Sequence, residues 1–343
     1  MDIKEGLSLK KHIILIIAVL ISLFICISLG SVSIPIKETI NIIWGLLLGK
    51  EPYGMYADIL IHVRLPRVLS VMPVGAALSL AGAAMQGIIR NPLADGSTLG
   101  TSSGAALGAV IALSLGVWLP SFPVAGTVVF AIVFSFISLI IVLSLSYAVD
   151  KLLSNNTIIL MGVIFSMFTS SFISLIMAFS GERLRSITFW TMGSLAGSNF
   201  NNVLLLLITL IIAGSALMLN ARELNAFSLG EDEAMHIGVD VKKTKLIILV
   251  SVSFLIGVSV SVGGSIGFVG LIVPHTCRLL FGGNHFKLLP SCVYVGAIFL
   301  LFMDLIARTL VSPVELPIGV VTSFIGAISF VIIYYRRRKH AGT

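Results

Sequence analysis

The sequence predicts an all-α integral membrane protein with about ten transmembrane helices. Hydrophobic residues make up 57% of the 343 positions, and charged residues only 11%. The mean hydropathy of +1.09 lies well outside the range of soluble globular chains. The apolar residues also form runs of about 20, the length that crosses roughly 30 Å of hydrocarbon as a helix. We therefore expect a single polytopic membrane domain over 1–343.

Ten apolar runs follow one another along the chain. The first follows Lys4, Lys10 and Lys11 and has the composition of a signal peptide. Its apolar run is long and no small-x-small cleavage site follows, so we expect an uncleaved span. The predicted spans are 12–30, 68–88, 97–116, 124–147, 157–179, 202–219, 245–263, 266–281, 290–309 and 317–335.

The basic residues predict the orientation of these spans. An even number of spans places both termini on one side, and most of the 22 Lys and Arg then fall on that same side. Because basic residues accumulate in cytoplasmic loops, we expect both termini in the cytosol. The net charge of +7 is then mostly a topology signal. No basic patch with interleaved aromatic residues indicates a nucleic-acid partner.

Small residues recur at helical spacing within several spans, which lets helix backbones approach closely in lipid. Two of these patterns are separated by a constant offset of 182 residues, and the helices carrying them run in opposite directions in the predicted topology. This relation is typical of transporters and predicts a weak inverted repeat. The matched residues are Gly75, Ser79 and Gly82 in one half and Gly257, Ser261 and Gly264 in the other.

Two spans are interrupted by helix-breaking residues. Pro92 lacks an amide proton and disfavours helix at Asn91, so the second span should end there on the cytosolic side. The segment 263–275 enters the eighth span with several glycines and places Pro274 inside it. Irregular backbone at membrane depth needs protein or a water-filled cavity to satisfy its polar groups. These breaks are candidate gates or hinges, and ordinary kinks satisfied by neighbouring helices are the alternative.

Few ionisable residues lie within the spans. Asp304 and Arg308 are one helical turn apart and can form an ion pair. We expect Arg308 to reach the external surface, near enough to serve as a contact. His275 lies beside Pro274 near a cytosolic helix end, where a hydrogen-bonded structural role is more common than proton relay. Proton coupling is therefore not predicted.

The polar segment 220–245 interrupts the apolar sequence on the predicted cytosolic side. Ser228 and Glu231 have capping-box spacing, in which the serine accepts from a first-turn amide and the glutamate reaches back. Gly238 then supplies a helix stop. A helix of two turns at most is not stable in water without something to pack against. The segment therefore predicts a small docking helix that contacts another protein.

The chain carries no motif for metal binding or covalent catalysis, because CxxC, HExxH and nucleophile-elbow patterns are missing. The nearest approach to a P-loop is 45–51, where Gly49-Lys50 is followed by Glu51 instead of Ser or Thr. We therefore expect a non-catalytic chain that binds no metal and no cofactor. If ATP drives the protein, another chain binds ATP and Mg²⁺. Three cysteines should be buried as small hydrophobic residues: Cys26, Cys277 and Cys292.

Six motifs together resemble one known family. They are Arg64-Leu65-Pro66-Arg67, the run from Gly75 to Gly82, RNPLADGSTLGTSSGAALGA from Arg90, NAFSLGEDEAMHIG from Asn225, GFVGLIVPH from Gly267 and ELPIGVVT from Glu315. The combination resembles the FecCD-type permeases, the membrane subunits of ABC importers for ferric siderophores, haem and cobalamin. The resemblance runs in unbroken order from about Arg64 to Tyr335.

The resemblance implies a type II ABC importer permease in the bacterial cytoplasmic membrane. Two ATPase subunits, an extracytoplasmic binding protein and a second permease, identical or related, would be its partners. The docking helix would be the coupling helix set into a groove of the ATPase. Its matching residues are Ser228, Leu229, Gly230, Glu231, Asp232, Glu233, Ala234, His236 and Gly238.

Two further sets of residues match functional positions of this family. One set would receive acidic residues of the binding protein: Arg64, Arg67 and Arg308. The other would form the cytosolic gates: Asn91, Leu93, Asn155 and Asn156. At the last two positions the family often carries small hydroxyl residues, so this chain keeps the polarity but has longer side chains.

By family frequency, the expected cargo is an iron–siderophore complex, with haem and cobalamin as alternatives. A secondary transporter driven by protons or sodium would also explain the inverted repeat. That class predicts carboxylates near the membrane midplane, and Asp304 is its one candidate. An intramembrane enzyme using His275, Asp304 or a serine would need a nucleophile and a base at matched depth, which the sequence does not offer.

Overall fold

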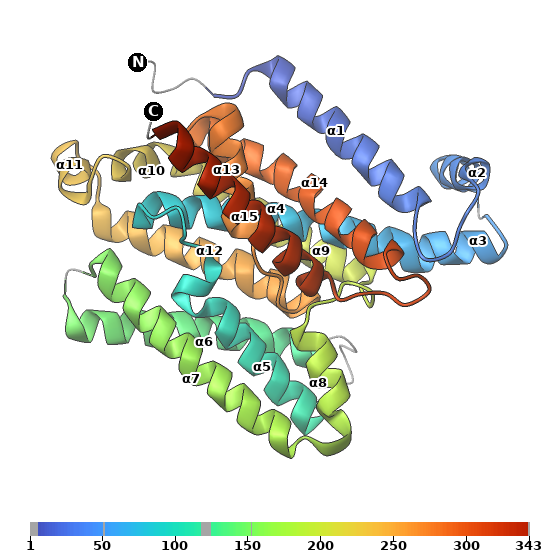
Figure 1. The fold of residues 1–343 in the computed structure, drawn as a ribbon, viewed down its shortest axis with the longest axis horizontal. Coiled ribbons are helices and arrows are strands. Elements are labelled where there is room, and N and C mark those ends of the chain that lie inside the picture. The colour runs from blue at the N-terminus through green and yellow to red at the C-terminus, as the bar shows by residue number, and fades with distance from the viewer. Residues whose placement is uncertain (1–5, 51, 118–124, 152, 342–343) are drawn as a thin grey trace.

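The computed structural model describes residues 6–50, 52–117, 125–151 and 153–341. A helix lies in each of the ten ranges expected to cross the membrane (Figure 1). Val124, where the fourth predicted span begins, lies outside the described residues. The helices are α1 (Leu9–Ser28), α4 (Leu65–Ile89), α5 (Thr101–Leu115), α6 (Ala125–Val149), α7 (Asn155–Phe179), α9 (Phe200–Leu219), α12 (Val241–Gly263), α13 (Val269–Phe281), α14 (His285–Thr309) and α15 (Ile318–Ala341).

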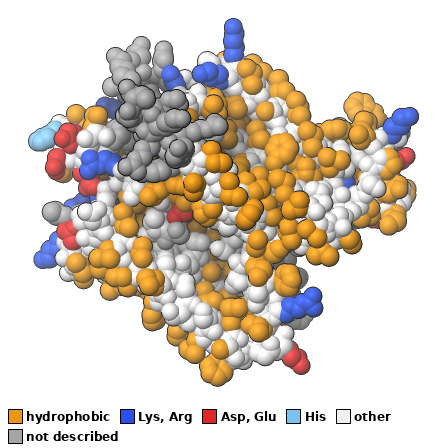
Figure 2. All heavy atoms as spheres, viewed as in Figure 1, with side chains coloured by type: hydrophobic (Ala, Val, Ile, Leu, Met, Phe, Trp, Pro, Cys, Tyr) orange, Lys and Arg blue, Asp and Glu red, His pale blue; other side chains and the backbone are white. Residues whose placement is uncertain are grey.

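Seven helical segments of the described chain are long and apolar enough to cross a membrane. The others are shorter: α5, α13 and the apolar part of α15, Ile318–Ile332. In Figure 2 hydrophobic side chains cover most of the visible face, and charged side chains gather around the α10–α11 end and near α2. An apolar body with polar ends suits a protein that crosses a bilayer.

The segment between the first two spans contains more helix than the sequence predicts. It forms α2 (Ile36–Leu47) and α3 (Met55–Asp58), and α3 continues through a π-helical turn, Ile59–Arg64, into α4. The continuous helix Met55–Ile89 is 35 residues long and begins well before the predicted start at 68. The remaining short helices are α8 (Leu184–Thr191), α10 (Ala221–Phe227) and α11 (Glu231–His236), with 3₁₀ turns at Gly96–Leu99 and Gly181–Arg183.

The helices α4 and α12 form the centre of the bundle. In the most apolar stretch of each helix, 89% of α4 and 72% of α12 is buried, against 17% of α7. In the chain, α4 is followed by α5 and α6, and α12 is followed by α13 and α14. In space the partners are exchanged: α4 packs on α13 and α14, and α12 packs on α5 and α6. This exchange agrees with the predicted inverted repeat.

Small residues set the distances between these helices. A Cβ at Gly75 would lie 2.3 Å from the carbonyl oxygen of Gly296, and one at Gly257 would lie 2.6 Å from Ser135 Oγ. Gly75 therefore lies where α4 crosses α14, and Gly257 lies where α12 crosses α6. These two helix crossings are equivalent in the predicted repeat. The third match is not equivalent, because Gly82 lies inside α4 whereas Gly264 ends α12 with φ +68°.

Both interrupted segments contain irregular backbone, as the sequence predicts. α4 ends at Arg90, which has φ +57°, and α5 begins only after Gly100. A Cβ at Gly96 would touch Ile256, beyond the midpoint of α12, so this segment turns back into the bundle. In the second break, α13 follows Phe268, with φ +67°, and contains Pro274. Residues of both breaks line a shared cavity, which agrees with the rule that non-helical backbone at membrane depth is buried in protein or lines a cavity.

Candidate functional site

The polar segment 220–245 forms two short helices, and its capping differs from the prediction. The N-cap of α11 is Gly230, with φ +148°, and not Ser228. Ser228 lies at the end of α10, where its hydroxyl donates to the carbonyl oxygen of Asn225 at 2.6 Å. The predicted capping box is therefore wrong, because glycine permits a turn between α10 and α11 that delays the second helix. Glu231 is consequently free to point elsewhere.

The predicted stop at Gly238 is confirmed. Gly238 has φ +87°, which favours glycine. Its amide donates to the carbonyl of Met235, and the amide of Val239 donates to that of Ala234, both at 3.0 Å. This pair of bonds is the Schellman arrangement that closes a helix end.

The surface of α11 combines acidic and apolar side chains. Ala234 is fully buried and faces the protein, whereas Asp232 and Glu233 are exposed. Beside them Met235 is 52% exposed and Ile237 60% exposed. Leu229, between α10 and α11, is 67% exposed and extends the same surface. We call Leu229, Asp232, Glu233, Met235, His236 and Ile237 the α11 surface; Figure 2 shows charged and histidine side chains at this end.

The helix α10 is fixed to the start of α14 by an asparagine pair. Asn225 Oδ1 accepts from the backbone amide of His285 at 2.8 Å and lies 2.9 Å from its Nδ1. Asn225 Nδ2 donates to Asn284 Oδ1 at 3.0 Å, and Asn284 in turn caps α14. The α11 surface therefore extends from a rigid base. Sequence reasoning included Asn225 in a motif but assigned it no role, because its partners lie about 60 positions away.

The predicted gate residues lie at the end of α4 and the start of α7, and one of them connects these two helices. Asn155 Nδ2 donates to the carbonyl oxygen of Ile88 at 3.0 Å, which joins the start of α7 to the last turn of α4. Just beyond that turn, Asn91 Oδ1 accepts from the amide of Leu93 at 2.9 Å and shapes the break. Asn156 and Leu93 are exposed. Their role as a gate stays a prediction.

The three arginines predicted to contact a binding protein are buried at the opposite end of the bundle. Arg308 is only 2% exposed, so the expectation that it reaches the surface is wrong. It donates to the carbonyls of Cys26 and Leu29 at 3.0 and 3.1 Å. Arg64 similarly donates to carbonyls at the end of α1. These bonds draw the guanidinium groups inward, because the last carbonyls of a helix lack partners of their own.

The predicted ion pair between Asp304 and Arg308 is confirmed and belongs to a larger network. Arg308 Nε lies 2.9 Å from Asp304 Oδ2, and Arg67 Nε lies 3.0 Å from Asp304 Oδ1. Arg67 also contacts Glu315 at 2.6 Å. We call Arg64, Arg67, Asp304, Arg308 and Glu315 the arginine network. It contains more guanidinium groups than carboxylates, so the network itself has a net positive charge.

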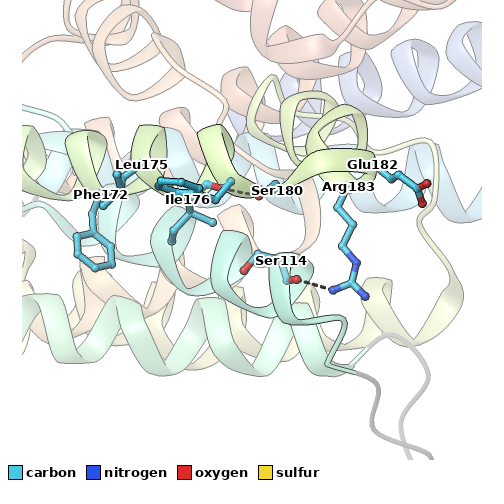
Figure 3. A pocket seen from close by; sticks show the side chains of 8 residues that line it. Ser114, Phe172, Leu175, Ile176, Ser180, Glu182 and Arg183 are labelled. Atoms are coloured by element: carbon cyan, nitrogen blue, oxygen red, sulfur yellow. Dashed lines mark hydrogen bonds between the residues drawn. The ribbon is translucent and has the colours of Figure 1, made fainter.

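A cavity of about 570 Å³ lies beside α7 at its C-terminal end (Figure 3). Phe172, Leu175 and Ile176 supply an apolar wall. Arg183 donates to the carbonyl oxygen of Ser114 in the last turn of α5. These residues do not stand out in the sequence, because serines and aromatic residues in an apolar helix carry no distinguishing pattern. Glu182 also lines the cavity, so its polar side carries an acidic and a basic residue.

The model of the FecCD transport family matches residues 15–336, nearly the whole chain. The chain belongs to this family. As a FecCD permease it is an ABC importer subunit, a multi-pass protein of the inner membrane that works with ATPase subunits and a binding protein.

Curated relatives are similar to this FecCD permease over almost their full length. It is 43% identical to the uncharacterized ABC transporter permease protein YvrB of Bacillus subtilis, covering 93% of this chain and 91% of the relative. It is 35% identical to the molybdate import system permease protein MolB of Haemophilus influenzae (95% and 94%). It is 34% identical to the hemin transport system permease protein HmuU of Yersinia pestis (95% and 96%).

A solved structure has the same architecture as this FecCD permease. It is an inward-facing conformation of an ABC transporter assigned to the metal-chelate type. The TM-score is 0.83 at 34% sequence identity, and the match covers 96% of this chain and 100% of the other. The architecture is therefore that of a type II ABC importer permease.

Proposed function

We propose that this FecCD permease forms the translocation path for an iron–siderophore complex and is driven by ATP hydrolysis through contacts at the α11 surface. The observation that carries the coupling role is that α11 exposes Met235 and Ile237 beside acidic groups. Exposed apolar residues rimmed by charge mark protein contact sites. The firm attachment of α10 to α14 supports this role, because a push on a loosely held helix would not reach the bundle.

The proposed assembly has two permeases, identical or related, and two ATPase subunits that hold ATP and Mg²⁺. This chain would bind no cofactor itself, and both termini would lie in the cytosol. The extracytoplasmic binding protein would approach Arg64, Arg67 and Arg308. These side chains are buried, so they would not contact the binding protein directly. We infer that their net positive charge attracts acidic residues of the binding protein from beneath the surface. The gate formed by Asn91, Leu93, Asn155 and Asn156 would close the cytosolic end.

An ion-driven transporter is the second candidate considered from the sequence, and its central residue argues against it. Asp304 is 1% exposed and contacts Arg67 and Arg308 together. Both of its carboxylate oxygens already contact guanidinium groups, so neither is left open to bind a transported cation. Among the cargoes, haem or cobalamin remains the alternative to a ferric siderophore. Because relatives are named for molybdate and for hemin import, the candidate cargoes need to be compared in one uptake assay.

Reversing charge on the α11 surface should uncouple uptake from ATP. In vesicles holding the permease, its ATPase and its binding protein, we expect Asp232→Lys combined with Met235→Lys to lower uptake of labelled ferric siderophore. The fall should be at least about tenfold, since loss of a central contact typically costs 1–2 kcal/mol or more. Glu38→Lys, which reverses an exposed acid on α2, is the matched control. Labelled haem, cobalamin and molybdate are assayed in parallel.

The measurement pairs uptake with retention of the ATPase during purification of the complex. Loss of both in the α11 variant but not in Glu38→Lys supports the coupling role. Uptake that needs no ATP and ignores the α11 variant would refute it. Transport of haem, cobalamin or molybdate in place of the siderophore would correct the cargo and leave the coupling role intact.

A further inference from the structure

We propose that Lys245 is a positioning residue that links α11 to the start of α7, so that a displacement of α11 moves the segment carrying Asn155 and Asn156. The inference rests on the proposed function, because it takes α11 to be the contact with the ATPase. It adds a physical route from that contact to the gate, which neither the motifs nor the comparisons assign.

Lys245 joins two segments that are distant along the chain. Its Nζ lies 2.8 Å from Glu231 Oε2 in α11 and 3.0 Å from the carbonyl oxygen of Leu153, before α7. The lysine side chain is only 5% exposed. Buried lysines are rare unless they are paired, because an unpaired ammonium group would lose its hydration. The two contacts together therefore determine where this ammonium lies.

Leu153, whose carbonyl accepts from Lys245, is held by local hydrogen bonds and lies two residues before the start of α7. Leu153 has φ +51°, an uncommon conformation for a residue other than glycine. Asp150 stabilises it, because its carbonyl accepts from the amide of Leu153 and its Oδ2 accepts from that of Ser154, both at 3.0 Å. Ser154 is the N-cap of α7. A shift of the Leu153 carbonyl therefore moves the first turn of α7.

The connection continues from α7 to α4. Asn155, the first residue of α7, donates to the carbonyl oxygen of Ile88. Ile88 lies in the last turn of α4, just before the break at Asn91. Hydrogen bonds thus join Glu231, Lys245 and Leu153, the backbone leads from Leu153 to Asn155, and a further hydrogen bond joins Asn155 to Ile88. This route runs from the helix proposed to contact the ATPase to both segments of the proposed gate.

Within the described residues, Glu231 is the side chain that connects α11 to a transmembrane helix by an ion pair. Its neighbours Asp232 and Glu233 are exposed. The other anchor of this region, Asn225, holds α10 and leads to α14, away from α7. The geometry therefore separates two tasks: Asn225 fixes the base of the α11 surface, and Lys245 connects α11 to the gate.

The test removes the donors of Lys245 in the complete importer, reconstituted in vesicles. Lys245→Met keeps the length of the side chain and loses the ammonium. We expect the ATPase to stay bound and uptake per ATP hydrolysed to fall at least about tenfold, the scale of one buried charged hydrogen bond. Lys245→Arg, which keeps the charge and several donors, should restore most of the loss. Lys243→Met, exposed near the start of α12, is the matched control.

A charge swap separates transmission from simple attachment of α11 to α12. Glu231→Lys with Lys245→Glu restores an ion pair, but a carboxylate at 245 cannot donate to the Leu153 carbonyl. We expect this double variant to stay uncoupled. Recovery of uptake per ATP in the swap would overturn the inference, and so would unchanged uptake per ATP in Lys245→Met. Loss of ATPase binding in Lys245→Met would also overturn it.

Should Lys245→Met fail to yield folded permease, Glu231→Gln replaces it, because this variant keeps the bond to Leu153 and nearly the same volume. It should lower uptake per ATP with the ATPase still bound, and unchanged coupling would overturn the inference. The outcome is separable from the proposed function. If the α11-surface variant of Asp232 and Met235 abolishes ATPase binding while Lys245→Met couples normally, only the route through Lys245 is wrong.

Discussion

Asp304→Ala is expected to destabilise the permease by about 3–5 kcal/mol, the cost of removing one partner from a buried ion pair. Asp304 contacts both Arg67 and Arg308, and its own exposure is 1%. Without it, the partners that Arg308 keeps among the described residues are the backbone carbonyls of Cys26 and Leu29. A lower midpoint of thermal unfolding in detergent, measured beside the wild-type permease, checks this expectation.

Two further variants show whether the loss comes from uncompensated charge. Glu315→Gln removes the other carboxylate of the arginine network, whose side chain is 31% exposed. Partly exposed pairs contribute little, so we expect a loss of about 1 kcal/mol or less. Asp304→Leu combined with Arg308→Met removes both charges and should recover part of the stability. If Asp304→Ala is as stable as the wild type, the arginine network makes no net contribution to the free energy of unfolding.

Gly82→Ala is expected to separate two central helices and to cost about 1–3 kcal/mol or more, the range for overpacking in a dense interior. The added Cβ would lie 2.1 Å from the carbonyl oxygen of Gly270 and 2.5 Å from its Cα. Both are backbone atoms of α13, so no side-chain rotation relieves the contact. The helix preference of alanine over glycine, about 0.5–1 kcal/mol, acts in the opposite direction and is too small to compensate.

Gly214→Ala is the matched control, because it also adds a methyl group to a buried helical glycine. Its Cβ would lie 3.2 Å from Leu80 Cδ2, the end of a flexible side chain. We expect this variant to unfold at or slightly above the wild-type temperature, while Gly82→Ala unfolds earlier and yields less folded protein. Equal stability of the two variants would mean that α4 and α13 can move apart freely.

Composition and local pattern were sufficient for much of the fold. Each of the ten apolar runs contains a helix, because a membrane-spanning helix needs a continuous run of apolar residues that is visible in the sequence. The Asp304–Arg308 pair and the stop at Gly238 were also within reach, since both depend on residues within one helical turn. Family membership followed from motifs in unbroken order and was confirmed by the match over 15–336.

The errors arose where a side chain had more than one possible partner. Ser228 has the spacing of a capping residue, but Gly230 starts α11 and Ser228 closes α10 instead. Arg308 was expected at the surface, yet the end of α1 lies beside it and offers carbonyl acceptors. In each case the prediction used residues close in the sequence, and the side chain instead bonds to a partner whose position depends on the fold or on the backbone conformation.

By itself, therefore, the sequence determined the membrane class, the positions of the ten helices predicted as spans, the polar segment that forms α11, and the family. The tertiary structure alone decided which charged residues from distant parts of the chain meet. Arg67 reaches Asp304 across 237 positions, and Lys245 reaches Leu153 across 92. The physical reason is that hydrophobicity and helix-ending signals act over a few residues, whereas buried charges take whatever partners the packed helices bring within about 3 Å.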